Sequence, residues 1–166
     1  SYTGATTITG GKLILERDIP ATSSTSFSGS GHLVIQPSSN SFTNAITYPI
    51  AGFNIASTVG GLTIGKPSNT SNITFGSATT IAGSITVYGG TITANASLAT
   101  TNSSNAPILL QGNKVFQNQG VLVQTNGSNI TYDVTNSPWT TASDQGISLG
   151  TADGTIATIN TSFSGV

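Results

Sequence analysis

A short apolar motif returns along this chain at nearly regular intervals. Each copy places two large apolar residues on either side of one other residue, and the copies begin at Leu13, Leu33, Leu62, Ile85, Ile108, Ile130 and Ile147. The successive intervals are 20, 29, 23, 23, 22 and 17 residues. Strands joined by hairpins follow one another at roughly 8 to 12 residues, so the longer intervals indicate full turns of a β-solenoid.

The segments between these motifs also have the pattern of short strands. They alternate apolar with polar residues, are rich in β-branched side chains and end at Gly, Asn or Ser, as in residues 72–76, 79–83 and 91–97. No segment has helical spacing of apolar residues without Gly or β-branched interruptions. The sequence therefore predicts an all-β parallel β-helix (β-solenoid), one domain over residues 1–166 or a segment of a longer array, with about seven coils of roughly 20–23 residues. An antiparallel, pilin-like β-sandwich stays open as the alternative, because Gly-Gly and Asn-Gly pairs also form two-residue hairpins.

Glycines stand where the chain of a solenoid has to bend. Gly83, Gly89 and Gly90 follow strand patterns, and we expect them at corners, where glycine adopts a positive φ without steric cost. Asparagine tolerates the same backbone conformation and can form side-chain ladders between coils. In each coil, alternate side chains should point into a narrow stacked core, which places Tyr132 inside and Tyr88 outside.

Two segments depart from the repeat. The 29-residue interval after Leu33 is too long for one coil and contains Phe42, Tyr48 and Phe53. We expect an additional loop there that packs its aromatic side chains over one side of the core. Residues 134–146 hold a proline and the single tryptophan, and this composition predicts a surface loop.

The composition excludes several classes of function. Only 5% of the residues are charged and the formal net charge is −1, so no basic field is available for nucleic-acid binding. No apolar run is long enough to span a membrane. Without cysteine the chain has no disulfides, thiolate metal ligands or cysteine nucleophile. Its many Ser, Thr and Asn residues, with few oxidisable side chains, predict an extracellular location.

Two stretches resemble repeats of bacterial surface proteins. The opening SYTGATTITGGKLIL resembles the autotransporter-associated β-strand repeat, matching its pattern at Tyr2, Thr3, Gly4, Thr6, Thr7, Gly10 or Gly11, Leu13 and Leu15. Residues 60–100 are similar to the β-helical repeats of filamentous-haemagglutinin-like adhesins. These resemblances imply a right-handed parallel β-helix, exported across a bacterial outer membrane as part of a long surface fibre. They imply no catalytic residues.

Catalytic and metal-binding patterns are weak in this sequence. His32 is the single histidine, and no Gly-x-Ser-x-Gly motif accompanies it, so we expect a structural or surface histidine. Glu16 and Asp18 flank Arg17, whereas the remaining acids are scattered over different predicted coils. A polysaccharide lyase or hydrolase would need paired carboxylates in one groove. The sequence predicts no catalytic residue, no metal site and no cofactor.

Surface aromatic and asparagine residues are the candidate contact and modification sites. Trp139, Tyr88 and Tyr48 are candidates for contact with a glycan or a neighbouring subunit. Candidate glycosylation sites are the seven Asn-x-Ser/Thr sequons, which begin at Asn69, Asn72, Asn95, Asn102, Asn126, Asn129 and Asn160. The expected partners are further copies of the chain, through end-to-end or lateral contacts, and glycans of a host or neighbouring cell.

These observations together predict a non-enzymatic structural or adhesive segment of a secreted bacterial adhesin or extracellular fibre. One alternative is a pilin-like subunit that polymerises by donating its first strand to a neighbour. The other is a β-helical polysaccharide lyase or hydrolase, which would place Glu16 and Asp18 in a groove with Lys12 or Arg17.

Overall fold

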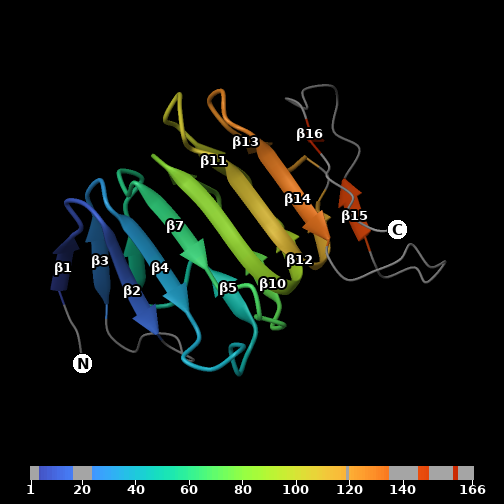
Figure 1. The fold of residues 1–166 in the computed structure, drawn as a ribbon, viewed down its shortest axis with the longest axis horizontal. Helices are drawn as coiled ribbons and strands as arrows, with labels where there is room; N and C mark the ends of the chain where they lie inside the picture. The colour runs from blue at the N-terminus through green and yellow to red at the C-terminus, as the bar shows by residue number, and fades with distance from the viewer. Residues whose placement is uncertain (1–3, 17–23, 119, 135–145, 150–158, 161–166) are drawn as a thin grey trace.

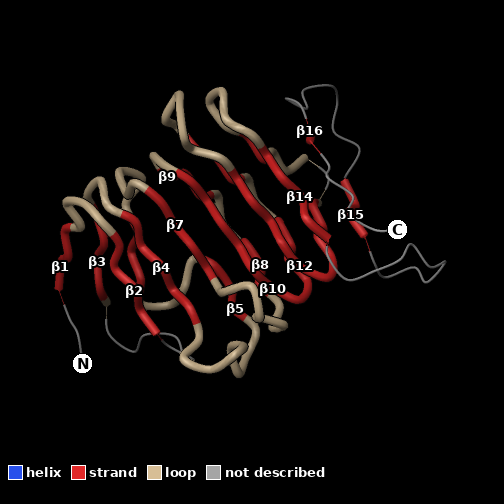
Figure 2. Tube along the Cα trace, in the orientation of Figure 1, coloured by secondary structure: helices blue, strands red, loops and turns tan. Residues whose placement is uncertain are grey.

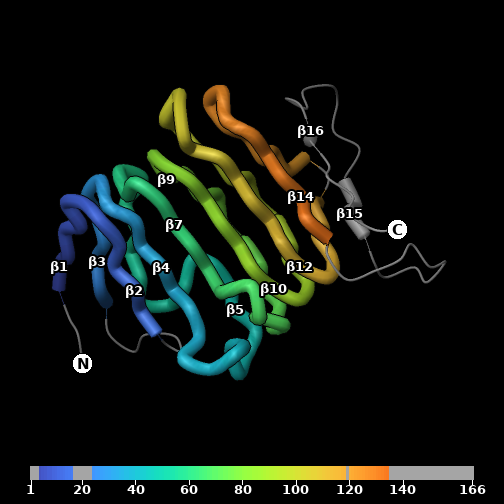
Figure 3. The backbone as a smooth tube through the Cα atoms, viewed as in Figure 1, coloured from blue at the N-terminus to red at the C-terminus, as the bar shows by residue number. Residues whose placement is uncertain are grey.

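The computed structural model describes residues 4–16, 24–118, 120–134, 146–149 and 159–160. Within these residues the chain is a parallel β-solenoid of about five turns without any helix. Figure 3 shows the coils stacked beside one another, with the chain advancing from the blue N-terminal coil to the orange coil at the other end. Every strand pair in the described part of the chain is parallel. The β-solenoid prediction is thus confirmed, and the antiparallel sandwich is excluded.

The first face of the solenoid carries the repeated apolar motif (Figure 1). Its strands stand in the order β2 (Lys12–Glu16), β4 (His32–Gln36), β7 (Gly61–Ile64), β10 (Ser84–Ala94), β12 (Ile108–Gln117), β14 (Ile130–Val134) and β16 (Ile159–Asn160). Within this face, the motif residues pair in the predicted order, Leu13 with Leu33, then Leu62, Ile85, Ile108 and Ile130. The row of stacked apolar residues is therefore confirmed from Leu13 to Ile130.

The last predicted copy of the motif does not belong to this row. Ile147 lies in β15 (Gly146–Leu149) and pairs with Val115 in the second half of β12. Ile130 pairs instead with Ile159 of β16. The 17 residues from Ile130 to Ile147 are too few for a complete turn, so the chain reaches only the next face. The described residues therefore form about five turns, whereas about seven coils were predicted for the chain.

The second face contains β5 (Ile46–Tyr48), β8 (Ile73–Phe75), the second halves of β10 and β12, and β15. Both β10 and β12 continue from the first face onto the second, so these two faces form one sheet. In β10 the buried residues alternate with half-buried ones except at the glycine pair. This alternation is the pattern that the sequence predicted for a coil with one face inside.

The three predicted corner glycines do stand at corners, but the expected positive φ is wrong. Gly83 lies in the bend before β10, and Gly89 and Gly90 lie where β10 passes from the first face to the second, yet none of the three has a positive φ. The reason for glycine is instead the close approach of the neighbouring coil. A Cβ on Gly83 would lie 1.6 Å from the carbonyl oxygen of Gly60, and one on Gly90 would lie 2.2 Å from that of Thr70. Positive φ occurs at other glycines, such as Gly65 (84°).

The third face is divided into two sheets. One has the order β1 (Gly4–Thr7), β3 (Thr25–Ser28) and β6 (Phe53–Ile55), and the other has β9 (Thr79–Ile81), β11 (Leu98–Thr100) and β13 (Val123–Gln124). Figure 2 shows β8 and β9 behind the strands of the first face. β6 and β9 belong to successive coils, yet they are not paired with each other. The continuous ladder of this face is therefore interrupted once, between β6 and β9.

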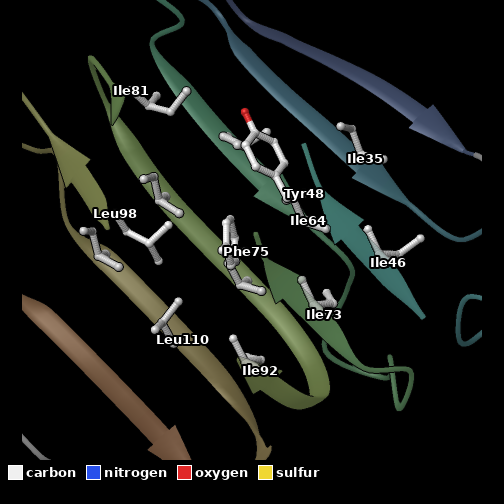
Figure 4. Packing of buried hydrophobic residues seen from close by; sticks show 14 of the residues in the cluster. Ile35, Ile46, Tyr48, Ile64, Ile73, Phe75, Ile81, Ile92, Leu98 and Leu110 are labelled. Atoms are coloured by element: carbon white, nitrogen blue, oxygen red, sulfur yellow. The ribbon is translucent and has the colours of Figure 1, made fainter. Parts of the chain in front are cut away.

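The core is a single apolar cluster between the three faces (Figure 4). Aliphatic residues fill most of it, and aromatic side chains thicken it near the 29-residue interval. Phe27 packs edge-on against Phe53 with ring centroids 5.3 Å apart, and Tyr48 packs against Phe75 at 5.4 Å. Phe42, Tyr48 and Phe53 are all buried, which confirms that this interval contributes its aromatic residues to the core. No helix of the described residues is long and apolar enough to cross a membrane.

Candidate functional site

The three predicted aromatic contact residues have different positions. Tyr88 is half-buried in β10 and points away from the core, as predicted. Tyr132 is buried in β14, also as predicted, and its hydroxyl donates to Oε1 of Gln117 at 2.6 Å. Tyr48 is only 5% exposed and packs in the core, so it does not stand on the outer surface, and the part of it that stays accessible lines a crevice. Trp139 lies outside the described residues.

The predicted glycosylation sequons divide in a similar way. Within the described part of the chain, the exposed sequon asparagines are Asn72, Asn95, Asn102, Asn126 and Asn129. Asn160 lies in β16, where side chains are not described. Asn69 is only 4% exposed, and its amide nitrogen already donates to the carbonyl oxygen of Tyr88 at 2.7 Å. A glycan at Asn69 is therefore incompatible with this fold, because the amide nitrogen is both buried and used.

Asn69 holds together three segments that are distant in the sequence. Its Oδ1 accepts from the backbone N–H of Phe42 at 3.1 Å and from the hydroxyl of Ser41 at 2.9 Å. Its Nδ2 donates to the carbonyl oxygen of Tyr88. The side chain therefore replaces backbone hydrogen bonds that the irregular loop after β4 cannot make with the next coil, which explains why a polar residue is buried here.

Replacing Asn69 with aspartate should destabilise the fold by about 3 kcal/mol, since a buried donor is lost and a buried charge is gained next to the carbonyl oxygen of Tyr88. The matched control is Asn95→Asp. Asn95 is exposed and its Oδ1 accepts from Nδ2 of Asn118 at 2.6 Å, a bond that a carboxylate keeps. Urea unfolding of both variants measures the difference, and equal midpoints would contradict the structural role of Asn69.

The pair Asn95 and Asn118 also confirms, at one position, the predicted asparagine ladder between coils. These residues occupy equivalent places in successive coils, 23 residues apart. Such a contact stabilises the stacking of one polar corner on the next.

His32 makes a structural contact. Its Nε2 lies 2.8 Å from Oγ1 of Thr63, which joins β4 to β7 on the outer side of the first face. Burial lowers the pKa of His32, and the nearby Lys12 lowers it further. The imidazole is consequently neutral at physiological pH and contributes a hydrogen bond between coils.

The acidic residues of the lyase alternative are only partly described. Glu16 accepts a hydrogen bond from Nε2 of Gln36 at 3.0 Å, between β2 and β4. Arg17 and Asp18 lie outside the described residues. Among the residues that the structure does describe, no group of three or more His, Asp or Glu side chains could hold a metal ion. The lyase or hydrolase alternative therefore stays a prediction.

A crevice of about 300 Å³ occupies the interruption of the third face. It lies between β6 and β9, and its lining includes Tyr48, Phe53, Asn54, Ser57, Thr79 and Thr80. None of the lining residues is charged. The sequence does not predict this crevice. The only indication in the sequence was the long interval after Leu33, which predicted an irregular coil without predicting a hollow beside it.

The hydroxyl of Tyr48 is an unusual polar group in this part of the core. The structure gives this buried hydroxyl no hydrogen-bond partner among the described residues. Figure 4 shows its oxygen at the far end of the ring from β5, on the side of the cluster where Ile81 of β9 lies. A buried hydroxyl without a partner costs free energy, so a polar ligand atom beside it would be stabilising.

The buried phenols make the fold sensitive to alkaline pH. Burial raises the pKa of Tyr48 and of Tyr132 to about 12, above the ordinary value of 10.0. The folded state thus favours the neutral phenols, and their contribution to stability is complete below pH 10 and is lost as the pH rises towards 12. We expect the free energy of unfolding to fall over this interval. Urea titrations at several pH values should show a smaller fall in the free energy of unfolding for Tyr48→Phe than for the native protein. If this free energy fell equally with pH in both proteins, the burial of the phenol would be contradicted.

Comparison with models of protein families, with curated proteins and with solved structures gives no match for this chain.

Proposed function

We propose that this chain is a non-enzymatic structural and adhesive segment of a secreted bacterial surface adhesin or extracellular fibre. The observation that carries the proposal is the uninterrupted parallel ladder from β2 to β16 on the first face. Along it each coil is hydrogen-bonded to the next, so added coils lengthen the molecule without a new core. Such an arrangement suits a stiff spacer that holds a binding region away from a cell.

The outer surface supports the same role. Outward positions of the first face include Thr63, Thr86 and Thr131, which stand in one row with Leu109. With only 5% charged residues in the whole chain, two such surfaces would meet without strong electrostatic repulsion. This favours lateral association of fibres and contact with uncharged glycans.

The location is tested by electron microscopy of cells that make the native protein, labelled with antibodies raised against this chain. We expect label along surface fibres and none in the cell interior. Label confined to the interior would overturn the proposal.

The lyase or hydrolase alternative is tested by incubating the purified protein with acidic polysaccharides. Release of new reducing or unsaturated ends would favour the enzyme over the structural segment.

A further inference from the structure

Among the strands that the structure describes, β6 and β9 border the crevice and each has one unpaired edge. In a parallel ladder, the backbone groups of alternate residues point towards the same neighbour. The N–H of Thr25 donates to the oxygen of Gly52, and the N–H of Ala56 donates to that of Phe27. Residues 52, 54 and 56 therefore face β3, and the N–H and C=O of Ile55 face the crevice.

On the opposite side of the crevice, β9 has the same arrangement of backbone groups. The N–H of Thr79 donates to the oxygen of Ser97, and the N–H of Thr101 donates to that of Ile81. Thr79 and Ile81 thus face β11, so the N–H and C=O of Thr80 face the crevice. Two parallel strand edges with free donors and acceptors consequently border the same hollow.

We propose that this crevice is an acceptor slot for one extended, uncharged peptide strand of a partner protein. A strand inserted parallel to β6 and β9 would lie about 4.8 Å from each and would pair with Ile55 on one side and Thr80 on the other. It would join the two separate sheets of the third face into one. The proposal does not depend on the structural and adhesive function proposed above.

The lining specifies the chemistry of the partner. Because no lining residue is charged, a charged side chain entering the slot would lose hydration without an opposite charge to replace it. Inward-pointing residues would meet the aromatic rings of Tyr48 and Phe53, so small apolar side chains fit best. A hydroxyl or carbonyl at this position would also hydrogen-bond to the Tyr48 hydroxyl, which has no partner among the described residues.

The probe is a capped peptide with the sequence TITANAS, an uncharged strand of this chain at residues 91–97. We expect saturable binding to the full chain, measured by fluorescence anisotropy of a labelled peptide. Hydrogen exchange provides the second readout. The amides of Ile55 and Thr80 should exchange faster than those of Asn54 and Ile81 in the free protein, and the peptide should slow both.

Two changes remove the pairing without removing the core. Thr80→Pro deletes the N–H that faces the slot but none that bonds to β11, and proline is tolerated at a strand edge of this kind. Thr80→Pro should weaken binding of the peptide about tenfold. The Thr80→Ala variant keeps the N–H and should bind the peptide as the native protein does. A probe methylated on alternate backbone nitrogens tests the native protein directly and should not bind.

The proposal is overturned if the methylated probe binds as well as the unmodified one, or if the Ile55 and Thr80 amides are already protected in the free monomer. Dimers of the protein alone that protect these two amides would make the occupant a second copy, which would overturn the assignment to a partner protein. Binding of the peptide, with protection from hydrogen exchange confined to these two amides, supports the proposal of an acceptor slot.

Discussion

Replacing Gly83 with alanine is expected to destabilise the solenoid by about 3 kcal/mol or more. The added Cβ would lie 1.6 Å from the carbonyl oxygen of Gly60, a backbone atom of the adjacent coil. Backbone cannot rotate away as a side chain can, so the two coils must separate. Because Gly83 does not have a positive φ, the effect is purely one of space.

The matched control is Gly76→Ala. A Cβ on Gly76 would meet its nearest neighbours at 3.7 Å, which is ordinary van der Waals contact, and this glycine does not have a positive φ either. Its free energy of unfolding should change by less than about 0.5 kcal/mol. Urea denaturation followed by circular dichroism compares the two variants. Equal stabilities would show that the coils at Gly83 are not as close as the structure places them.

Replacing Phe75 with alanine is expected to cost about 4 kcal/mol. Phe75 is fully buried in β8, and its ring packs against Tyr48 at the point where the second face meets the crevice. Removal of the ring leaves a hollow that the stacked coils cannot close, because each coil is fixed by hydrogen bonds to its neighbours. The peptide slot should also be distorted in this variant.

Phe116→Ala removes the same atoms from the outer surface and serves as the control. Phe116 is half-buried on β12, and the ammonium of Lys114 lies 5.9 Å from its ring centre. We expect a loss of no more than about 1 kcal/mol from this change. Thermal unfolding should therefore separate the two variants clearly. A large effect at Phe116, or a small one at Phe75, would contradict the assignment of the inner and outer faces.

The sequence alone was enough to predict the coil period and the row of stacked residues. The spacing of Leu62, Ile85 and Ile108 matches the length of one turn. The two-residue alternation of a strand predicts that each of these side chains points into the core. The burial of Tyr132 followed from the same pattern. These features are periodic, so a single sequence shows the pattern for them several times.

The candidate site could not be predicted in this way. The burial of Asn69 depends on where the loop that contains Phe42 meets the next coil, and the crevice depends on the failure of β6 and β9 to pair. Neither feature repeats in the part of the chain that the structure describes. A sequon pattern reports residue types only, so it could not separate Asn69 from the exposed asparagines.

The sequence by itself thus determined the all-β class, the coil length and the inner face of each strand, because these follow from local periodicity. Only the tertiary structure decided that Ile147 belongs to the second face, that Gly83 and Gly90 are required by neighbouring backbone, and that one face is interrupted. The physical reason is that these properties depend on distances between coils. Such distances are set by how irregular turns stack, and local alternation carries no information about that stacking.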